Sequence, residues 1–203
     1  MKRLLCVLTL GSMFGLGVYA QAPKADLFLG YSMLRANSAR NIPAFTNNGG
    51  LGTFAWNFSD YVAAEFEFAG YHNGNIHDIQ FDTTEMTYLF GPRFSAGRHK
   101  TVDPYLHTLF GGVHLTTSIL PNLVVNPLAT PGTRIGASQD AFAMALGGGL
   151  DIKLGKHFLL RPIQLDYLLT RLEDFGQTGL PSANRNQHNL RYAAGIGFNF
   201  GAR

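Results

Sequence analysis

The chain has 203 residues, of which 46% are hydrophobic, 12% aromatic and only 14% charged, and its formal net charge is +3. The apolar content and small net charge exclude an intrinsically disordered protein. The scattered basic residues argue against a nucleic-acid partner. Beyond the N-terminus, no run approaches the roughly 18 apolar residues that a membrane-spanning helix requires. The length fits a single domain.

Residues 1–22 have the pattern of a cleaved secretory signal peptide. Lys2 and Arg3 precede an apolar segment, residues 4–18, and the small-residue motif Ala20-Gln21-Ala22 follows it. Cleavage would remove Cys6, the only cysteine, together with two positive charges. We therefore expect an exported protein whose mature part, residues 23–203, forms one domain with no disulfide and no thiol chemistry.

Eight segments of the mature part alternate apolar and polar side chains with the period of two that is typical of β-strands. They cover residues 26–36, 50–58, 62–71, 85–95, 105–116, 141–154, 163–171 and 189–200. Each has about ten residues, the length of a tilted strand that crosses a bilayer. In residues 105–116 the alternation leaves two options open, because either Leu106 and Phe110 or Tyr105 and Leu109 could form the apolar face.

The connections between these segments alternate strictly between short and long. The short connections are residues 59–61, 96–102 and 155–157, and the long ones are residues 37–49, 72–81, 117–139 and 172–188. This order is typical of an antiparallel meander with tight turns at one end. The sequence therefore predicts an all-β, eight-stranded, antiparallel up-and-down transmembrane β-barrel, with both termini at the short-turn, periplasmic end.

The alternation alone does not decide which face of the barrel looks outward, because a lipocalin-like soluble barrel would turn its apolar face inward. Here the polar face is rich in glycine and alanine, which suits a narrow lumen. The apolar face carries aromatic residues near strand ends, such as Trp56, Tyr88 and Phe200, as expected at membrane interfaces. We therefore expect the apolar side chains to face lipid.

The charged residues of the strands share the polar face. A basic side chain on the lipid face costs about 2–4 kcal/mol at the membrane midplane, so these charges should point into the lumen and pair there. We predict a luminal ion-pair network of Glu65, Glu67, Arg93, Asp151, Lys153, Asp166 and Arg191. Such a network either only stabilises the interior or gates a narrow pore. An eight-stranded interior is just wide enough to be filled by side chains, which argues against bulk diffusion of solutes.

Five short stretches carry a family resemblance: residues 88–93, 104–112, 147–151, 162–167 and 195–200. Together they resemble the small outer-membrane β-barrel proteins related to the transmembrane domain of outer-membrane protein A. The resemblance implies an outer-membrane location, contact with outer-membrane lipid and lipopolysaccharide, and recognition by the barrel-assembly machinery through the terminal Gly-x-x-Phe-x-Phe pattern. This pattern departs from the usual form, since three residues follow Phe200 and Ala193 replaces a polar residue. We expect no peptidoglycan-binding domain.

Other candidate chemistry is limited. His72, His77 and Asp78 could hold a metal, and His114 with Ser118 is the nearest nucleophile-like pair, but neither spacing is diagnostic. We expect no metal, no cofactor and no catalysis. Five arginines near the long connections could contact lipopolysaccharide phosphates, or could simply be solvated: Arg35, Arg40, Arg134, Arg171 and Arg185.

The functional expectation is a monomer with a structural, adhesion or surface-interaction role, exerted through its long connections and above all through residues 117–139. A narrow ion or small-solute pore is the first alternative. A lipid-modifying outer-membrane enzyme is the second, and it would need an apolar cavity inside the barrel.

Overall fold

The computed structural model describes residues 24–37, 45–74, 81–98, 100–119, 135–171 and 186–201. The predicted signal peptide lies outside these residues, so its cleavage stays a prediction. The eight strands of the described chain are β1 (Ala25–Ala36), β2 (Phe45–Asn57), β3 (Val62–Asn73), β4 (Phe81–Ser95), β5 (Val102–Ile119), β6 (Ile135–Lys153), β7 (Phe158–Arg171) and β8 (Asn186–Phe200). The described chain contains no helix that is both long and apolar enough to cross a bilayer.

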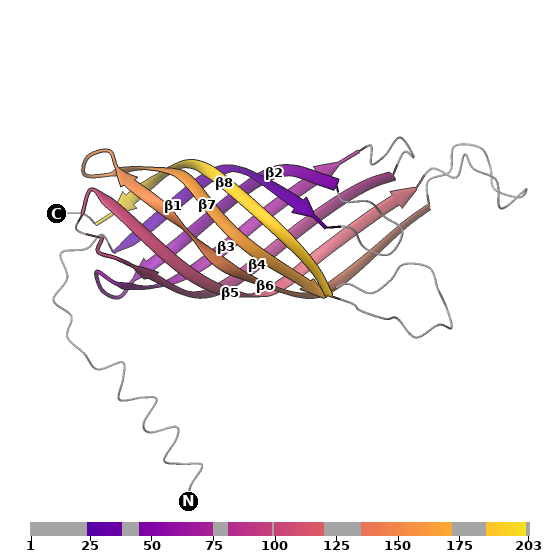
Figure 1. The fold of residues 1–203 in the computed structure, drawn as a ribbon, viewed down its shortest axis with the longest axis horizontal. Helices are drawn as coiled ribbons and strands as arrows, with labels where there is room; N and C mark the ends of the chain where they lie inside the picture. The colour runs from indigo at the N-terminus through magenta and orange to yellow at the C-terminus, as the bar shows by residue number, and fades with distance from the viewer. Residues whose placement is uncertain are drawn as a thin grey trace, which may run out of the picture.

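The strands form one closed antiparallel barrel in sequence order, which confirms the predicted fold class (Figure 1). Each strand pairs with the next, and β1 closes the cylinder against β8. Ala25 pairs with both Trp56 and Phe200, so the first and last strands start and finish at the same end of the barrel. Closure satisfies every strand edge, which a spanning sheet requires because lipid offers no hydrogen bonds.

Several strands extend further into the long connections than the alternation predicts. We expected residues 45–49, 72–73, 81, 117–119, 135–139 and 186–188 in connections, but they belong to β2, β3, β4, β5, β6 and β8. In β4 and β5 these strand ends carry hydroxyl side chains on both faces, so the apolar–polar alternation is lost. For example, Thr84 pairs with Thr116, and Thr83 with Thr117. Threonine fits a pleated surface well, and a hydrogen-bonded ladder does not need an apolar face.

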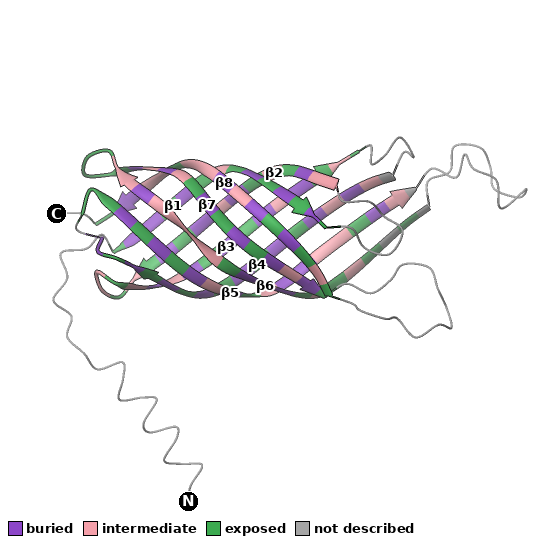
Figure 2. Ribbon diagram, in the orientation of Figure 1, coloured by how far each residue is buried: buried purple, intermediate pink, exposed green. Residues whose placement is uncertain are grey.

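Buried and exposed residues alternate along the strands (Figure 2). The exposed residues include the large apolar side chains and the buried ones the charged side chains, which confirms that the apolar face is the outer one. Outward-pointing Leu29, Leu106 and Ile196 are 62%, 68% and 64% exposed. The open question in β5 is settled the same way, since Leu106 and Phe110 lie outside whereas Tyr105 and Leu109 are buried. The buried face contains four arginines and seven acids among the described residues.

Candidate functional site: the luminal ion-pair network

Arg191 lies at the centre of the luminal network. It is fully buried on β8 and donates hydrogen bonds to two carboxylates. Its Nη1 and Nη2 bind Glu67 Oε1 and Oε2 at 2.5 and 2.8 Å, and its Nε and Nη2 bind Asp166 Oδ2 at 2.9 and 2.6 Å. Such forked contacts are among the strongest charge-assisted hydrogen bonds in proteins. They connect β3, β7 and β8 across the lumen.

His107 on β5 extends the network towards β3. Its Nε2 lies 2.8 Å from Asp166 Oδ1, and its Nδ1 lies 3.4 Å from Glu65 Oε2. Gln164 adds an amide donor, with Nε2 2.8 Å from Asp166 Oδ2, while its Oε1 accepts from the Tyr105 hydroxyl at 2.9 Å. Asp166 therefore receives partners from β5, β7 and β8.

Asp151 on β6 forms a second centre, held by two arginines. Arg93 Nη2 lies 2.5 Å from Asp151 Oδ2, and Arg161 Nε lies 2.7 Å from Asp151 Oδ1. The Arg93 guanidinium also stacks 3.8 Å from the Tyr105 ring centroid, and Arg161 lies 4.1 Å from that of Phe28. Aromatic faces stabilise these cations where water is excluded.

A glycine makes room for the network. A Cβ added at Gly147 on β6 would lie 2.1 Å from Asp166 Oδ1 and 2.3 Å from the Leu165 carbonyl oxygen. No real Cβ can take that position, so glycine is required where the Asp166 carboxylate crosses over β6.

The short-turn end of the lumen is closed by Arg98. Its Nη1 donates to the Ser59 carbonyl at 2.9 Å, and its Nε lies 3.8 Å from Asp26 Oδ2. Burial in this turn lowers the pKa of Arg98 to about 10, which still leaves it charged at neutral pH. Asp103 accepts from the Gly97 backbone N–H at 3.2 Å and fixes the same turn.

The structure brings together six of the seven residues proposed for the network: Glu65, Glu67, Arg93, Asp151, Asp166 and Arg191. Lys153 is the exception, since it is half-buried and forms no ion pair with a described carboxylate. The pairing register of β6 with β7 shifts between Leu150 and Ile152, and Lys153 ends β6, where water can reach its ammonium group. The described residues thus give no support for Lys153 as a member of the network, and its role stays a prediction.

The alternation pattern missed two members of the network, His107 and Arg161. His107 shares the inward face with Tyr105 and Leu109 in β5, whose facing the sequence left open. Arg161 has the parity of outward-pointing Ile163, but the register of β7 with β8 shifts between Arg161 and Gln164. Both Arg161 and Gln164 are buried as a result, because a bulge turns side chains out of strict alternation.

The candidate residues outside the lumen are only partly described. Arg35 is exposed and donates to Thr46 Oγ1 at 3.0 Å, and Arg171 is exposed at the end of β7. Arg40, Arg134, Arg185, His77 and Asp78 lie outside the described residues. In the described part of the chain, no group of three or more metal-ligating side chains is placed to hold a metal.

Two of the candidate histidines lie at the long-connection end of the wall. His114 pairs with Asp140 at 2.7 Å, and His72 lies 3.5 Å from Asp82. Both pairs are exposed or half-exposed on the wall. Ser118, the expected partner of His114, lies two ladder positions beyond Thr116 on β5 and pairs across to Asp82.

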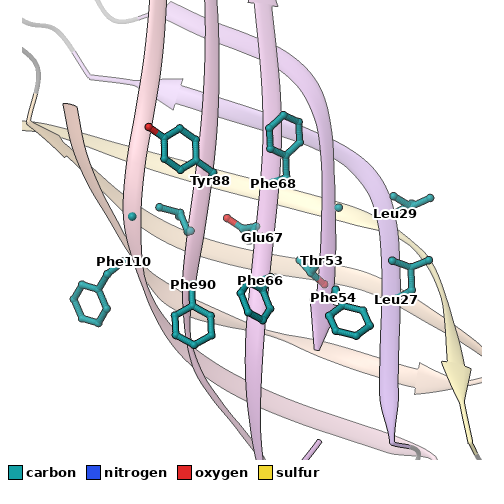
Figure 3. A pocket seen from close by; sticks show the side chains of 13 residues that line it. Leu27, Leu29, Thr53, Phe54, Phe66, Glu67, Phe68, Tyr88, Phe90 and Phe110 are labelled. Atoms are coloured by element: carbon teal, nitrogen blue, oxygen red, sulfur yellow. The ribbon is translucent and has the colours of Figure 1, made fainter. Parts of the chain in front are cut away.

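An apolar hollow lies on the outer wall, over β1 to β5, and has a volume of about 630 Å³ (Figure 3). Outward-pointing side chains form its walls, among them Leu29, Phe54, Phe68 and Phe90, which are 38–62% exposed. Gly52 leaves space between them, since its cross-strand neighbours are Leu29 and Phe68. The hollow is lined mostly by apolar side chains of the outer surface, and the buried residues Thr53, Glu67 and Leu89 also belong to its lining.

No protein family matches the sequence, and no curated protein is similar to it. Solved structures do match. Ail, the attachment invasion locus protein of Yersinia pestis, has a TM-score of 0.60 at 15% identity, with 88% of this chain and 99% of that chain covered. Neisserial surface protein A has a TM-score of 0.59 at 11% identity, with the same coverage. The outer membrane protein OprG from Pseudomonas aeruginosa has a TM-score of 0.53 at 14% identity, covering 89% of this chain and 99% of that chain.

At these identities the likeness concerns the fold. Ail, Neisserial surface protein A and OprG are small outer-membrane barrels of eight strands. Their match covers nearly all of each solved chain, and the closed antiparallel topology agrees with it. This chain has the fold of the small eight-stranded outer-membrane β-barrels, as its motifs indicated.

Proposed function

We propose that this protein resides in a bacterial outer membrane and acts there as a scaffold that presents its long connections for attachment or surface interaction. The support for the location is the outer wall, where large apolar side chains on all eight strands are exposed. In water this surface would be a severe aggregation hazard, whereas in a bilayer it matches the lipid tails. The fold shared with outer-membrane proteins supports the same location.

The filled lumen is the observation that carries the proposed role. Arg93, Arg161 and Arg191 occupy the interior, each at most 1% exposed and each bound to a carboxylate. A lumen closed in this way favours a role at the membrane surface over a pore. Buried, ion-paired arginines in the described lumen argue against an acyl-binding luminal pocket of the kind that a lipid-modifying enzyme would need.

The surface role rests on the part of the barrel that neither the membrane nor the luminal side chains cover. The lipid-facing wall is covered by the membrane and the lumen by its own side chains, so the long-connection end offers the largest surface to a partner outside the cell. Two of the structural neighbours carry attachment or surface in their names, Ail and Neisserial surface protein A. We propose the connection between β5 and β6 as the main contact element and expect the protein to act as a monomer without a cofactor.

The test is an adhesion assay with bacteria that display the full chain. Residues 120–134 are replaced by a Gly-Ser segment of equal length, and residues 154–157 at the short-turn end receive the same treatment as a control. We expect the first replacement to reduce binding to mammalian cells at equal surface amounts, and the control to bind like the unmodified protein.

Conductance in planar bilayers tests the pore alternative in parallel. We expect no steady single-channel current from the full chain at any voltage. Equal adhesion of both replacements would contradict the attachment role, and a stable current would favour the pore.

A further inference from the structure

The lysines of the chain are gathered at the short-turn end of the barrel. Apart from Lys2, in the predicted signal peptide, the sequence has four lysines, and none of them lies in a long connection. Lys24 precedes β1, Lys100 lies in the turn between β4 and β5, Lys153 ends β6, and Lys156 lies in the turn between β6 and β7. We call these four residues the lysine rim.

The strand ends that carry the lysine rim are neighbours around the barrel. The backbone N–H of Lys153 donates to the Thr101 carbonyl at 2.8 Å, which places Lys153 beside the turn that contains Lys100. The backbone N–H of Lys24 donates to the Phe200 carbonyl at 2.9 Å, which joins β1 to the end of β8. The lysine rim therefore follows one arc of the barrel end, from β5 through β6, β7 and β8 to β1 (Figure 1).

The acids near the lysine rim are mostly turned into the barrel and do not neutralise it. Asp26, Asp103 and Asp151 are all buried, and their partners are buried arginines, an asparagine amide and a backbone N–H group. The other described acid at this end is Asp60, which is half-buried in the turn between β2 and β3, outside the arc.

The lysines themselves stay at the surface. Lys24, Lys100 and Lys156 are exposed and Lys153 is half-buried, and none of the four forms an ion pair with a described carboxylate. The short-turn end thus presents four ammonium groups against one half-buried carboxylate.

The opposite end of the described barrel carries both signs of charge. Arg35 and Arg171 are exposed there, but Asp140 is exposed at the same end and Asp82 is half-buried. Within the described residues, the excess of positive charge is therefore confined to the short-turn end.

Large apolar side chains of the outer wall border the lysine rim. Leu154 and Phe158 lie two residues before and after Lys156 and are 57% and 58% exposed, and Trp56, on the strand beside Lys24, is 49% exposed. Exposed aromatic side chains at strand ends mark the boundary between hydrocarbon and headgroups. A lysine stem can lie along such a surface while its ammonium group reaches the headgroups. In the proposed membrane, the lysine rim thus lies at the depth of lipid phosphates, which favours a lipid ligand over a cell-wall polymer.

We propose that the lysine rim binds the phosphate groups of anionic phospholipids in the membrane leaflet at the short-turn end. Basic residues next to a membrane surface attract anionic lipids, and the attraction grows with each lysine or arginine. The inference rests on the proposed membrane location and adds to it a lipid class and a leaflet. Binding at this end holds the short turns at the membrane surface and leaves the long-connection end available to a partner.

The test compares two spin-labelled lipids in phosphatidylcholine vesicles that contain the full chain. One probe is phosphatidylglycerol, whose headgroup is negative, and the other is phosphatidylcholine, whose headgroup is neutral overall. Electron spin resonance measures the fraction of each probe that the barrel wall immobilises. We expect a larger immobilised fraction for phosphatidylglycerol, and we expect this excess to decrease in concentrated KCl, because salt screens exposed charges.

Substitutions at both ends of the barrel show which charges cause the excess. Lys153→Gln combined with Lys156→Gln should lower it, and glutamine at all four positions of the lysine rim should remove it. Arginine at the same four positions keeps the charge and should keep the excess. The matched control is Arg35→Gln combined with Arg171→Gln, which removes two exposed charges from the opposite end and should leave most of the excess in place. All six side chains are exposed or half-buried, so we expect the variants to fold.

The possible failures are distinguishable. Equal immobilised fractions of the two lipids would overturn this proposal and leave the membrane location in place, and so would an excess that survives glutamine at all four positions. The absence of an immobilised component for either lipid would overturn the membrane location and this proposal with it. Retention of isolated peptidoglycan by the vesicles, without a lipid preference and lost in the glutamine variant, would assign the lysine rim to the cell wall instead.

Discussion

Replacing Arg191 by methionine should weaken the barrel more than any comparable change at its ends. Methionine keeps most of the volume of the side chain but removes the guanidinium that binds Glu67 and Asp166. Both carboxylates are completely buried in the structure, so neither can turn to water once the partner is lost. The variant therefore has two carboxylates in the interior without their main counter-charge.

The expected magnitude follows from the four hydrogen bonds that Arg191 makes, at 2.5 to 2.9 Å. Their strengths do not add, because they share one charged group. Removing one partner of a buried ion pair costs about 3–5 kcal/mol, which corresponds to roughly two to three and a half orders of magnitude in the folding equilibrium. His107 and Gln164 still contact Asp166, so we expect the lower half of this range.

The assay is urea unfolding of the full chain in phospholipid vesicles, followed by the fluorescence of Trp56, which is 49% exposed on the outer wall. Arg171→Met, at an exposed strand end, serves as the control and should change the free energy of unfolding by less than about 1 kcal/mol. Adding Glu67→Gln to Arg191→Met should recover part of the loss, because it removes one uncompensated charge. An Arg191→Met variant as stable as the Arg171→Met control would refute the reasoning.

Three further predictions concern space, lipid contact and conduction. Gly147→Ala should destabilise the barrel, because its Cβ would meet Asp166 Oδ1 at 2.1 Å. Gly70→Ala should be tolerated, because nothing lies within 4 Å of the added Cβ. The two variants are compared by the fraction of each protein whose gel mobility still changes on heating. Phe68→Arg, at a site 57% exposed on the outer wall, should lower the free energy of unfolding in vesicles by about 2–4 kcal/mol, and no effect would contradict a lipid-facing wall. His107→Gly opens space beside Asp166 and should allow transient currents in planar bilayers where the wild type shows none; a wild type that conducts as well would contradict a filled lumen.

The alternation of apolar and polar side chains was sufficient to predict the barrel. In a closed transmembrane sheet, odd and even positions of a strand point to opposite faces, one towards lipid and one towards the lumen. One strand tested this rule, since β5 offers two partly apolar faces. There the structure turns Leu106 outward and Tyr105 with His107 inward. The polar strand ends could not be predicted, because Thr84 and Thr116 pair in a ladder whose two faces are equally hydrophilic.

Most of the luminal network was predictable from side-chain parity. Glu67, Asp166 and Arg191 lie in regular ladder segments, and they meet as expected. Asp151 lies at the register shift between β6 and β7 and still joins the network, whereas Arg161 lies at the shift between β7 and β8, and there the alternation gives the wrong facing. Which acid pairs with which base depends on how far neighbouring strands are shifted along one another around the barrel. This shift could not be predicted from the sequence.

The proposed membrane barrel requires an apolar outer wall in contact with lipid, with the acids and bases meeting inside. Spin labels attached to cysteines introduced in turn at each position of β3 test this directly. Collision with oxygen dissolved in the bilayer should alternate along the strand, high at Phe66 and Phe68 and low at Glu65 and Ala69. Oxygen collision rates that do not alternate, or frequent collision of Phe66 and Phe68 with a water-soluble relaxation agent, would contradict a lipid-facing wall.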